Sequence, residues 1–302
     1  MQTGLGERMS SAGVPVQRAL RSTALGLVAV LGVAAFVTAA DARGRRHRRQ
    51  AEAYDPPYSS IVVDANSGAV LQATSADSAR HPASLTKMMT LYLLFERLEA
   101  GKIKMSTELP VSAHAAAQEP SKLDLKPGQS IDVDTAIRAI VTKSANDVAV
   151  VIAEALGGSE ESFARMMTAK ARALGMMHTV YRDASGLPND EQITTARDMT
   201  ILARAIQDRF PQYYHYFSTR TFRYQGEEIR NHNHLLGRIA GVDGMKTGYI
   251  HDSGFNIVVS MRRNSRHLIA VVFGGHSARA RDARVVGLLD DTYALASVKR
   301  TA

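Results

Sequence analysis

The sequence predicts a mixed fold of the α/β class (α+β type), in which an antiparallel sheet built from both ends of the chain is covered by a central helical block. Alternating apolar runs bounded by turn residues occur near the start of the 302-residue chain and again near its end. Between them, apolar residues recur with helical spacing. Apolar residues make up 45% of the chain and charged residues 22%, which is typical of a globular protein with a sizeable core.

The strands are expected in two groups. Ser60–Asp64 and Ala69–Ala73 flank the turn sequence Ala65–Gly68, so the folded part opens with a hairpin. After residue 218 the pattern returns to strand. The expected strands there are Val242–Tyr249, Gly254–Met261 and Leu268–Gly274, separated by turn residues as in an antiparallel meander. Because these two groups of strands lie at the two ends of the chain with helices between them, we expect the strands to form one sheet that the helices cover.

The helices are expected between these groups and at the end. The first runs from Ser84 to Ala100, with Gly101 as its stop. Ser159 and Thr195 stand where N-caps belong. The remaining helices are expected over 133–142, 145–156, 159–174, 195–208 and 281–297.

The first 57 residues have a different composition from the rest. Arginines precede an apolar run, Ala24–Val37, and small residues follow it up to Ala42, as in a secretory leader. The run has about 14 residues, fewer than the ~18–20 of a membrane-spanning helix. We expect residues 1–42 to be a signal peptide or a retained N-terminal anchor, 43–57 a basic linker, and 58–302 one folded domain. Arginines at 43–49 oppose translocation of the run, so cleavage and retention both stay open.

The charge distribution argues against a nucleic-acid partner. The net charge is +8, but the first 50 residues hold eight arginines against two acidic residues. The remaining residues hold 29 basic and 27 acidic side chains, so the folded part is nearly neutral. The chain has no cysteine, which excludes disulfides, thiol catalysis and cysteine-based metal sites.

Ser84-Leu-Thr-Lys87 is the first motif with chemical potential. Its serine and lysine lie three residues apart at an expected helix start, so the amine can reach the hydroxyl. A serine hydroxyl needs an adjacent base, and a desolvated lysine can serve as one near neutral pH. It is the only Ser-x-x-Lys match in the chain. Alone, the motif equally fits a capping serine beside a solvated lysine.

Two further short motifs follow in the chain. Ser144-Ala-Asn146 lies between two expected helices and offers a hydroxyl for proton relay and an amide for a peptide backbone. Lys246-Thr-Gly248 lies in an expected strand, where the glycine lets a peptide lie against the strand edge. Lys246 and Thr247 then offer a charge and a hydroxyl to a carboxylate. Each motif alone is weak, but their order and contexts together are specific.

With these motifs, the sequence resembles the low-molecular-mass penicillin-binding proteins, the serine-type D-alanyl-D-alanine carboxypeptidases. The resemblance runs from about Ser59 to Leu295. It includes His81–Met89, Lys143–Asp147, Ala184–Pro188, Thr195–Met199 and Gly241–Gly248. It implies a transpeptidase fold like that of penicillin-binding proteins and β-lactamases, and a single catalytic penicillin-binding domain over 58–302. It also implies peptidoglycan stem peptides as substrates, β-lactams as inhibitors and no cofactor.

The resemblance also implies a role for each motif residue. Ser84 would attack the carbonyl between two D-alanines, Lys87 would take its proton, and Ser144 would pass a proton to the leaving D-alanine. The implied substrate-binding residues are Asn146, Lys246, Thr247, Gly248, Tyr249 and Arg281. Among them, the N–H groups of Ser84 and Tyr249 would hold the oxyanion, and Arg281 would lie near the terminal carboxylate.

The chain departs from the family pattern in two places. Members often carry His directly after Lys-Thr-Gly, where this chain has Tyr249. Many also carry a second, β-rich domain and a C-terminal amphipathic anchor. Because this sequence ends just after the last expected helix, we expect no C-terminal β domain, and membrane association only through the N-terminal segment.

Three other functions remain as alternatives. A D,D-endopeptidase acting on cross-links is a close relative that the motifs do not separate cleanly. A β-lactamase would need a glutamate that holds the deacylating water, and no glutamate between the second and third motifs has the expected setting. A non-catalytic wall-binding protein would not need all four Ser and Lys residues. His232-Asn-His234 has a metal-ligand spacing but no evident third ligand, so we expect no metal and a structural or surface role.

Overall fold

The computed structural model describes residues 54–301, of which those from Asp55 onward form one compact unit. The expected leader and most of the expected basic linker lie outside the described residues. Within residues 54–301, no helix combines the length and the apolar character needed to cross a membrane.

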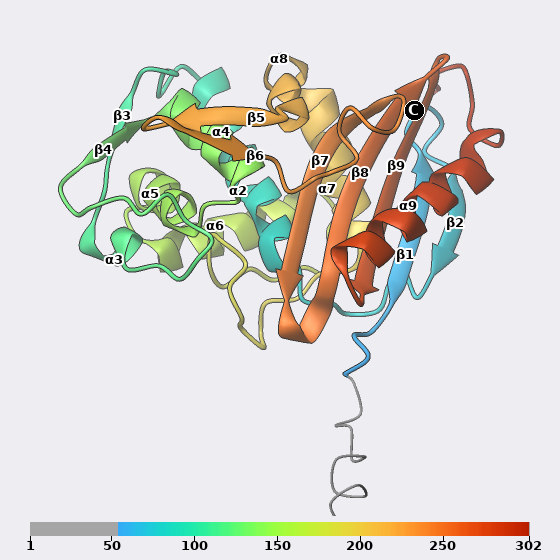
Figure 1. Cartoon of the computed structure of the whole chain (residues 1–302), viewed down its shortest axis with the longest axis horizontal. Coiled ribbons are helices and arrows are strands. Elements are labelled where there is room, and N and C mark those ends of the chain that lie inside the picture. Colours follow the sequence, from blue (N-terminus) through green and yellow to red (C-terminus); the bar gives the residue numbers. More distant parts are fainter. Residues whose placement is uncertain (1–53, 302) are drawn as a thin grey trace, which may run out of the picture. The chain divides into compact units, whose positions relative to one another are not determined.

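A five-stranded antiparallel sheet joins the two ends of this unit (Figure 1). Its strands are β1 (Ser59–Asp64), β2 (Val70–Thr74), β7 (Val242–Ile250), β8 (Gly254–Arg263) and β9 (Arg266–Gly275). They lie in the order β2-β1-β9-β8-β7, so the first strand pairs with the last, with Ile61 opposite Val271. This confirms the expected sheet from both chain ends, and it leaves β7 as an edge strand.

Alternation along β9 places apolar side chains on both faces of the sheet. Ile269, Val271 and Phe273 join a core cluster with the helical block, whereas Leu268, Ala270 and Val272 join a second cluster. On that second side, α9 (Ala278–Tyr293) packs against β9 and β8, as Figure 1 shows. The sheet is therefore covered on both faces, by the helical block on one and by α9 on the other.

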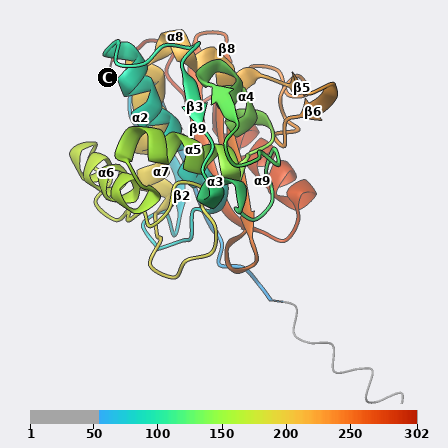
Figure 2. The ribbon, with the colours of Figure 1, turned by 90° about the vertical axis from the view of Figure 1, so that its left-hand side faces the viewer.

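The helical block is built around α5 (Asn146–Gly157), which contacts α2 (Lys87–Glu99), α3 (Ala113–Ala116), α4 (Val133–Thr142) and α6 (Glu160–Ala173). Figure 2 looks onto this side of the molecule and shows α5 among these helices. Residues Asn146–Ala153 are all buried, as expected of a central helix that is apolar on every side. The block is completed by α7 (Ala196–Arg209) and the short α8 (Pro211–Tyr214).

Several boundaries differ from those expected. The last helix begins at Ala278, three residues before the expected start, because Ser277 caps it by accepting the N–H of Ala280. It ends at Tyr293 rather than 297. The sequence pattern also missed the short hairpins β3 (Glu108–Pro110)–β4 (Ser130–Asp132) and β5 (Thr221–Tyr224)–β6 (Glu227–Arg230). Strands of three or four residues are too short to show an alternation.

An aromatic cluster ties the helical block together, and it yields a test of the fold. Phe95 of α2 has no exposed surface, and its ring lies 5.7 Å from that of Phe210 and 5.1 Å from that of Tyr213. We expect Phe95→Ala to lower the free energy of unfolding by about 3–5 kcal/mol, because it removes buried apolar area and leaves a cavity. The measurement is urea denaturation followed by circular dichroism.

Met177→Ala is the control for this experiment, because Met177 is 60% exposed. It should change the free energy of unfolding by less than about 0.5 kcal/mol. Equal losses for the two variants would contradict the assigned core.

Candidate active site

Ser84 lies in a 3₁₀ turn, η1 (Ala83–Thr86), and the α-helix begins only at Lys87. The expectation that an α-helix starts at Ser84 was therefore wrong by three residues. The turn is tightened because the N–H of Leu85 donates to the carbonyl of Pro82 at 3.2 Å. A 3₁₀ turn has three residues per turn, so the side chains at positions 84 and 87 lie directly above one another.

A glycine allows a second segment to pack on this turn. A Cβ at Gly186 would lie 1.8 Å from the carbonyl oxygen of Ala83, and Gly186 has a φ of +88°. Only glycine fits such a close approach with that backbone conformation. The segment 183–186 therefore lies directly against the turn that carries Ser84.

The amine of Lys87 is fully buried beside Ser84. Its Nζ lies 3.1 Å from Ser84 Oγ and donates to Asn146 Oδ1 at 2.7 Å and to the carbonyl of Ser185 at 2.5 Å. Burial lowers the pKa of Lys87 to about 7, against the opposing effect of nearby carboxylates. A neutral amine has two N–H donors and one lone pair. Two carbonyl acceptors use the donors, which leaves the lone pair for the Ser84 hydroxyl.

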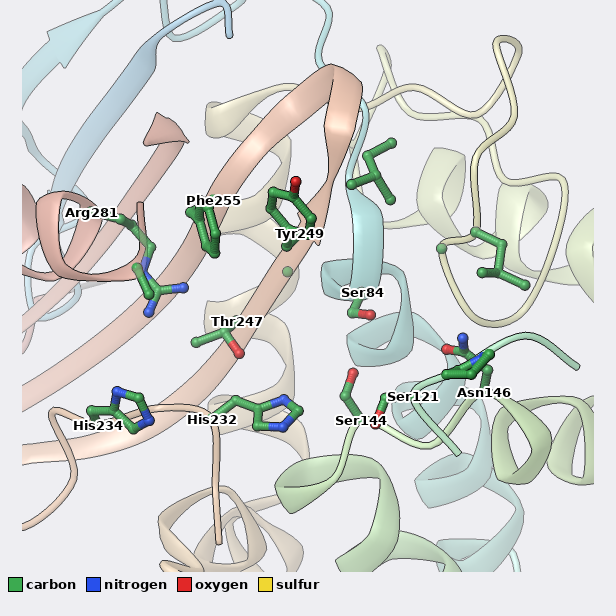
Figure 3. A pocket seen from close by; sticks show the side chains of 16 residues that line it. Ser84, Ser121, Ser144, Asn146, His232, His234, Thr247, Tyr249, Phe255 and Arg281 are labelled. Carbon is green, nitrogen blue, oxygen red and sulfur yellow. The ribbon is translucent and has the colours of Figure 1, made fainter. Parts of the chain in front are cut away.

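Ser144 lies beside a second buried lysine. It occupies the link between α4 and α5 with a φ of +62°, and its Oγ accepts from Lys246 Nζ at 2.9 Å. Lys246 also donates to the carbonyl of Thr247 at 3.0 Å. Burial lowers the pKa of Lys246 well below its ordinary value, and the charges of Lys87 and Arg281 lower it further. In Figure 3 the Ser84 and Ser144 side chains lie around the same space.

The oxygen and the nitrogen of the Asn146 side-chain amide both form hydrogen bonds within the protein. Its Oδ1 accepts from Lys87, and its Nδ2 donates to the carbonyl of Glu119 at 2.8 Å. The side chain was expected to orient a substrate peptide. In this structure it positions the amine of Lys87, while it also lines the pocket.

Strand β7 lies against the backbone of Ser84. A Cβ at Gly248 would approach the Ser84 nitrogen and the Pro82 carbonyl oxygen to 3.1 Å, so the absent side chain lets the two segments meet. Tyr249 is 54% exposed, and its ring lies 4.3 Å from that of Phe255. The two rings form an aromatic wall beside the serine (Figure 3).

Arg281, in the first turn of α9, approaches the pocket from the other face of the sheet. Only 2% of its surface is exposed, and its Nη1 donates to the carbonyl of Asn256 at 3.1 Å. Nε and Nη2 both donate to Asp282 Oδ1. These bonds hold the guanidinium at the pocket wall, where it adds fixed positive charge.

A pocket of about 400 Å³ brings most of the predicted site residues together. Its walls include Ser84, Ser144, Asn146, Thr247, Gly248, Tyr249 and Arg281, while Lys87 and Lys246 lie behind the two serines and bond to them.

The sequence analysis missed two histidines of this pocket. His232 and His234 line it, facing Thr247 and Arg281 in Figure 3, where a structural or surface role had been expected. Burial and, to a lesser extent, the charges of Lys246 and Lys143 together lower the pKa of His232 to about 4. The sequence signal that could have found them is the alternation of asparagine and histidine over residues 231–234. In the structure the two asparagines are buried and the two histidines point away from them, toward the pocket. Among residues 54–301, no group of three or more His, Cys, Asp or Glu could hold a metal ion.

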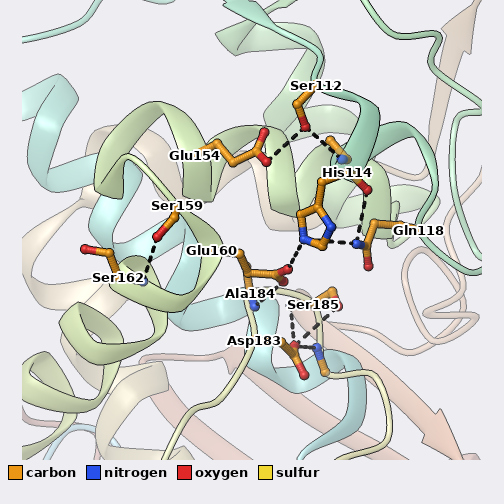
Figure 4. Close-up of polar contacts among 12 residues, drawn as sticks. Ser112, His114, Gln118, Glu154, Ser159, Glu160, Ser162, Asp183, Ala184 and Ser185 are labelled. Atoms are coloured by element: carbon orange, nitrogen blue, oxygen red, sulfur yellow. Dashed lines mark hydrogen bonds and ion pairs between the residues drawn. The ribbon is translucent and has the colours of Figure 1, made fainter.

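Three carboxylates lie close enough to Lys87 for their charges to act on its amine. Glu160 accepts the N–H of Ala184 at 3.1 Å and pairs with His114 at 2.8 Å (Figure 4). Asp183 accepts the N–H groups of Ser185 and Gly186, and this shapes the segment whose carbonyl binds Lys87. The charges of Asp183, Asp147 and Glu160 raise the pKa of Lys87, so they partly offset the effect of burial.

Asp147 fixes the opposite wall of the pocket. Its carboxylate accepts the N–H groups of Leu123 and Leu125 at 3.0 and 3.2 Å. Ser121, which lines the pocket, donates from its hydroxyl to the carbonyl of Lys143 and accepts the N–H of Asn146 at its own carbonyl. Residues near the second motif therefore hold the 121–125 segment in place.

An antiparallel sheet covered by helices, with Ser-x-x-Lys, Ser-x-Asn and Lys-Thr-Gly at one pocket, defines the penicillin-recognising serine enzymes of the transpeptidase fold. A family model described as D-alanyl-D-alanine carboxypeptidase matches residues 49–277. The chain therefore belongs to the D-alanyl-D-alanine carboxypeptidase family.

Individual relatives agree with this assignment. The chain is 36% identical over 236 residues to the D-alanyl-D-alanine carboxypeptidase DacA of Escherichia coli, covering 76% of this chain and 59% of that protein. It is 33% identical over 252 residues to DacF of Bacillus subtilis, covering 82% and 64%. Penicillin binding protein 5 of Haemophilus influenzae superposes with a TM-score of 0.75 at 32% identity, covering 78% and 70%. The chain thus spans about three fifths of the length of the two curated relatives.

The electrostatics of Lys87 can be tested without a substrate. We expect the Lys87 amine to titrate near pH 7, measured by NMR on protein carrying ¹³C at the lysine Cε atoms. Lys87→Met assigns the signal by removing it. Glu160→Gln should shift this titration to lower pH, because the ammonium form loses the attraction of a nearby carboxylate while the amide can still accept the Ala184 N–H.

Glu161→Gln is the matched control. Glu161 is the next residue of α6, but its side chain is 84% exposed and pairs with Arg165. Its removal should leave the Lys87 titration unchanged. A Lys87 signal that titrates near 10.5 would contradict the assigned neutral base.

Proposed function

We propose that this protein is a serine-type D-alanyl-D-alanine carboxypeptidase that removes the terminal D-alanine from peptidoglycan stem peptides. The observation that carries the proposal is the buried Lys87 amine, held by two carbonyl oxygens with its third position 3.1 Å from Ser84 Oγ. Membership of the family and the Lys246–Ser144 hydrogen bond support it.

In the proposed acylation step, neutral Lys87 takes the proton of Ser84 as Oγ attacks the carbonyl carbon of the penultimate D-alanine. The carbonyl oxygen becomes an oxyanion and accepts hydrogen bonds from the N–H groups of Ser84 and Tyr249. The close approach of Gly248 to the Ser84 nitrogen supports this pairing of donors.

Collapse of the tetrahedral intermediate breaks the C–N bond. The proton that Lys87 took passes through the Ser144 hydroxyl to the departing nitrogen, so D-alanine leaves with a neutral amine. Lys246, which donates to Ser144 Oγ, orients that hydroxyl. Lys246, Thr247 and Arg281 face the carboxylate of the leaving D-alanine, while Asn146 keeps the base in place and Gly248 admits the peptide backbone.

Deacylation reverses the roles. Lys87, neutral again, takes a proton from a water molecule that attacks the ester, and Ser84 regains its hydroxyl as the shortened peptide leaves. A β-lactam opens by the same attack, but its leaving nitrogen stays tethered to the acyl group. The acyl-enzyme therefore persists, and we propose β-lactams as inhibitors.

The pocket walls disfavour a β-lactamase. No glutamate lines the pocket in the part of the chain that the structure describes. Glu160 points to Ala184 and His114, and Glu191 pairs with Arg182 with 73% of its side chain exposed. A glutamate-held deacylating water therefore has no place among these residues.

We also propose that the protein acts outside the cytoplasm, where its substrate lies. The leader pattern of residues 1–42 supports export, either as a cleaved signal peptide or as a retained anchor. Residues 43–57 would then link it to a single catalytic domain over 58–302. The small net charge of residues 51–302, with 29 basic and 27 acidic side chains, supports a peptide substrate rather than a nucleic acid.

The proposal is tested with Ser84→Ala, fluorescent penicillin and a peptide that ends in D-Ala-D-Ala. The wild type should keep the label on a denaturing gel and release D-alanine. Ser84→Ala should take no label and should lose about 10⁴-fold or more of kcat, because no other group supplies the nucleophile.

Ser130→Ala is the control, since Ser130 is exposed in the β3–β4 hairpin and its hydroxyl donates to Glu108 at 2.6 Å. It should behave as the wild type does. Label that persists on Ser84→Ala, or folded wild type that takes no label, would reject the mechanism. Rapid loss of label with consumption of penicillin would indicate a β-lactamase instead.

A further inference from the structure

His114 belongs neither to the three motifs nor to the walls of the pocket, yet it bonds to a carboxylate behind the reacting groups. It lies in α3, and its Nε2 is 2.8 Å from Oε2 of Glu160, the first residue of α6. The Glu160 side chain is 14% exposed, whereas 57% of the His114 side chain is exposed. The pair therefore joins a group at the surface to a group inside the helical block.

Glu160 holds the backbone beside the Lys87 amine. Its Oε1 accepts the N–H of Ala184 at 3.1 Å, and the carbonyl of Ala184 accepts from Thr90 Oγ1 at 2.6 Å. Because both polar groups of this residue are fixed, the next carbonyl is fixed as well. That carbonyl belongs to Ser185, and it accepts from Lys87. In Figure 4 the glutamate lies between the histidine and this segment.

The helix that carries the histidine leads into the wall that holds the second acceptor of the amine. Glu119 follows α3 closely, and its carbonyl accepts from Asn146 Nδ2 at 2.8 Å. The other end of the same amide, Asn146 Oδ1, accepts from Lys87. The contact between His114 and Glu160 therefore ties together the two segments that position both acceptors of the amine.

The pair also carries charge that acts on the amine. The negative charge of Glu160 raises the pKa of Lys87, against the larger effect of burial. The hydrogen bond between the pair needs a hydrogen on His114 Nε2, which a neutral imidazole and an imidazolium can both supply. A neutral histidine leaves the charge of the carboxylate unopposed, whereas a charged histidine offsets part of it.

Other charged groups at α3 do not make this link. Within residues 54–301, Glu154 accepts from Ser112, the N-cap of α3, at 2.9 Å, and Lys122 donates to the carbonyl of Ala116 at 3.4 Å. Neither is among the groups whose charges raise the pKa of Lys87. The connection from this helix to the amine therefore runs through one carboxylate.

We propose that His114 is a positioning residue of the active site, which acts through Glu160 on the segment 183–186 and on the Lys87 amine. In either form it holds the carboxylate in place, and in its charged form it also offsets the carboxylate's charge. The base then stays neutral, and the enzyme active, to a lower pH than without the histidine. The inference rests on the proposed function, because Lys87 is the base of that reaction.

The experiment compares the full-length wild type with His114→Gln and Glu160→Gln. Two quantities are measured for each: the pH profile of kcat/KM for a peptide ending in D-Ala-D-Ala, and the NMR titration of the Lys87 amine. His114→Gln keeps an N–H donor but loses the positive charge. It should move the acidic limb of the profile and the titration up by about 0.3–0.5 pH unit, so kcat/KM on that limb falls about two- to threefold. Glu160→Gln should move both to lower pH.

Two further variants test whether the histidine acts through the carboxylate. In Glu160→Gln protein, the additional change His114→Gln should alter neither measurement, because the charge that the histidine offsets is gone. His114→Ala removes the donor as well as the charge. It should lower kcat severalfold at the pH optimum, where His114→Gln retains the wild-type kcat, because the carboxylate then loses its support.

His178→Gln is the matched control. His178 is an exposed histidine in the segment after α6, and it bonds to Asp198 through its backbone N–H. Its replacement removes the same type of side chain at a similar exposure and should leave the profile and the Lys87 titration unchanged.

The outcomes distinguish the two proposals. An active wild type, with an unshifted profile and titration in His114→Gln, overturns the inference and leaves the proposed function standing. Equal shifts by His114→Gln in the presence and in the absence of Glu160 also overturn the inference. A wild type that releases no D-alanine and takes no penicillin label overturns the proposed function and the inference together.

Discussion

A primary amine with no exposed surface loses its hydration, and this loss alone can lower the pKa of a buried lysine by about 3–5 units. Lys87 is in that position, and its amine can remain there only because specific acceptors are brought to it. One acceptor is the amide of Asn146, at the start of the central helix α5, and the other is the carbonyl of Ser185. The arrangement of α2, α5 and the segment 183–186 therefore follows from the need to hold one amine beside one hydroxyl.

The carboxylates behind this amine set how far its pKa falls. With burial alone Lys87 would be too weak a base, and with full compensation it would stay protonated. The charges of Asp183, Asp147 and Glu160 offset part of the effect of burial, so the pKa of Lys87 lies between these two limits. The same three carboxylates also accept backbone N–H groups that shape the pocket. Because each carboxylate has both functions, replacement by the isosteric amide changes the charge while a hydrogen-bond acceptor remains.

Local sequence patterns predicted most of the fold and the Ser and Lys residues that meet at the pocket. Five strands and the long helices were predicted because each is long enough to show its period, and the Ser84–Lys87 spacing fixed their contact whether the turn was α or 3₁₀. Local pattern could not show that Asn146 binds Lys87, or that His232 and His234 face the pocket, because these contacts join segments far apart in the chain. The 3₁₀ turn was also missed, and Gly186, which packs against it, is likewise distant in sequence.

The positive groups of the pocket act on one another, and in the proposed mechanism they also act on the substrate. Lys87, Lys246 and Arg281 lie close enough for the charges of Lys87 and Arg281 to lower the pKa of Lys246. A carboxylate bound at Thr247 would bring the negative charge that these groups lack and would raise the pKa of Lys246 again. In the proposed mechanism a bound carboxylate would thus favour the charged form of Lys246, and a charged donor would strengthen its hydrogen bond to Ser144. The proposed mechanism therefore couples recognition of the carboxylate and delivery of the proton to the leaving nitrogen through one buried amine.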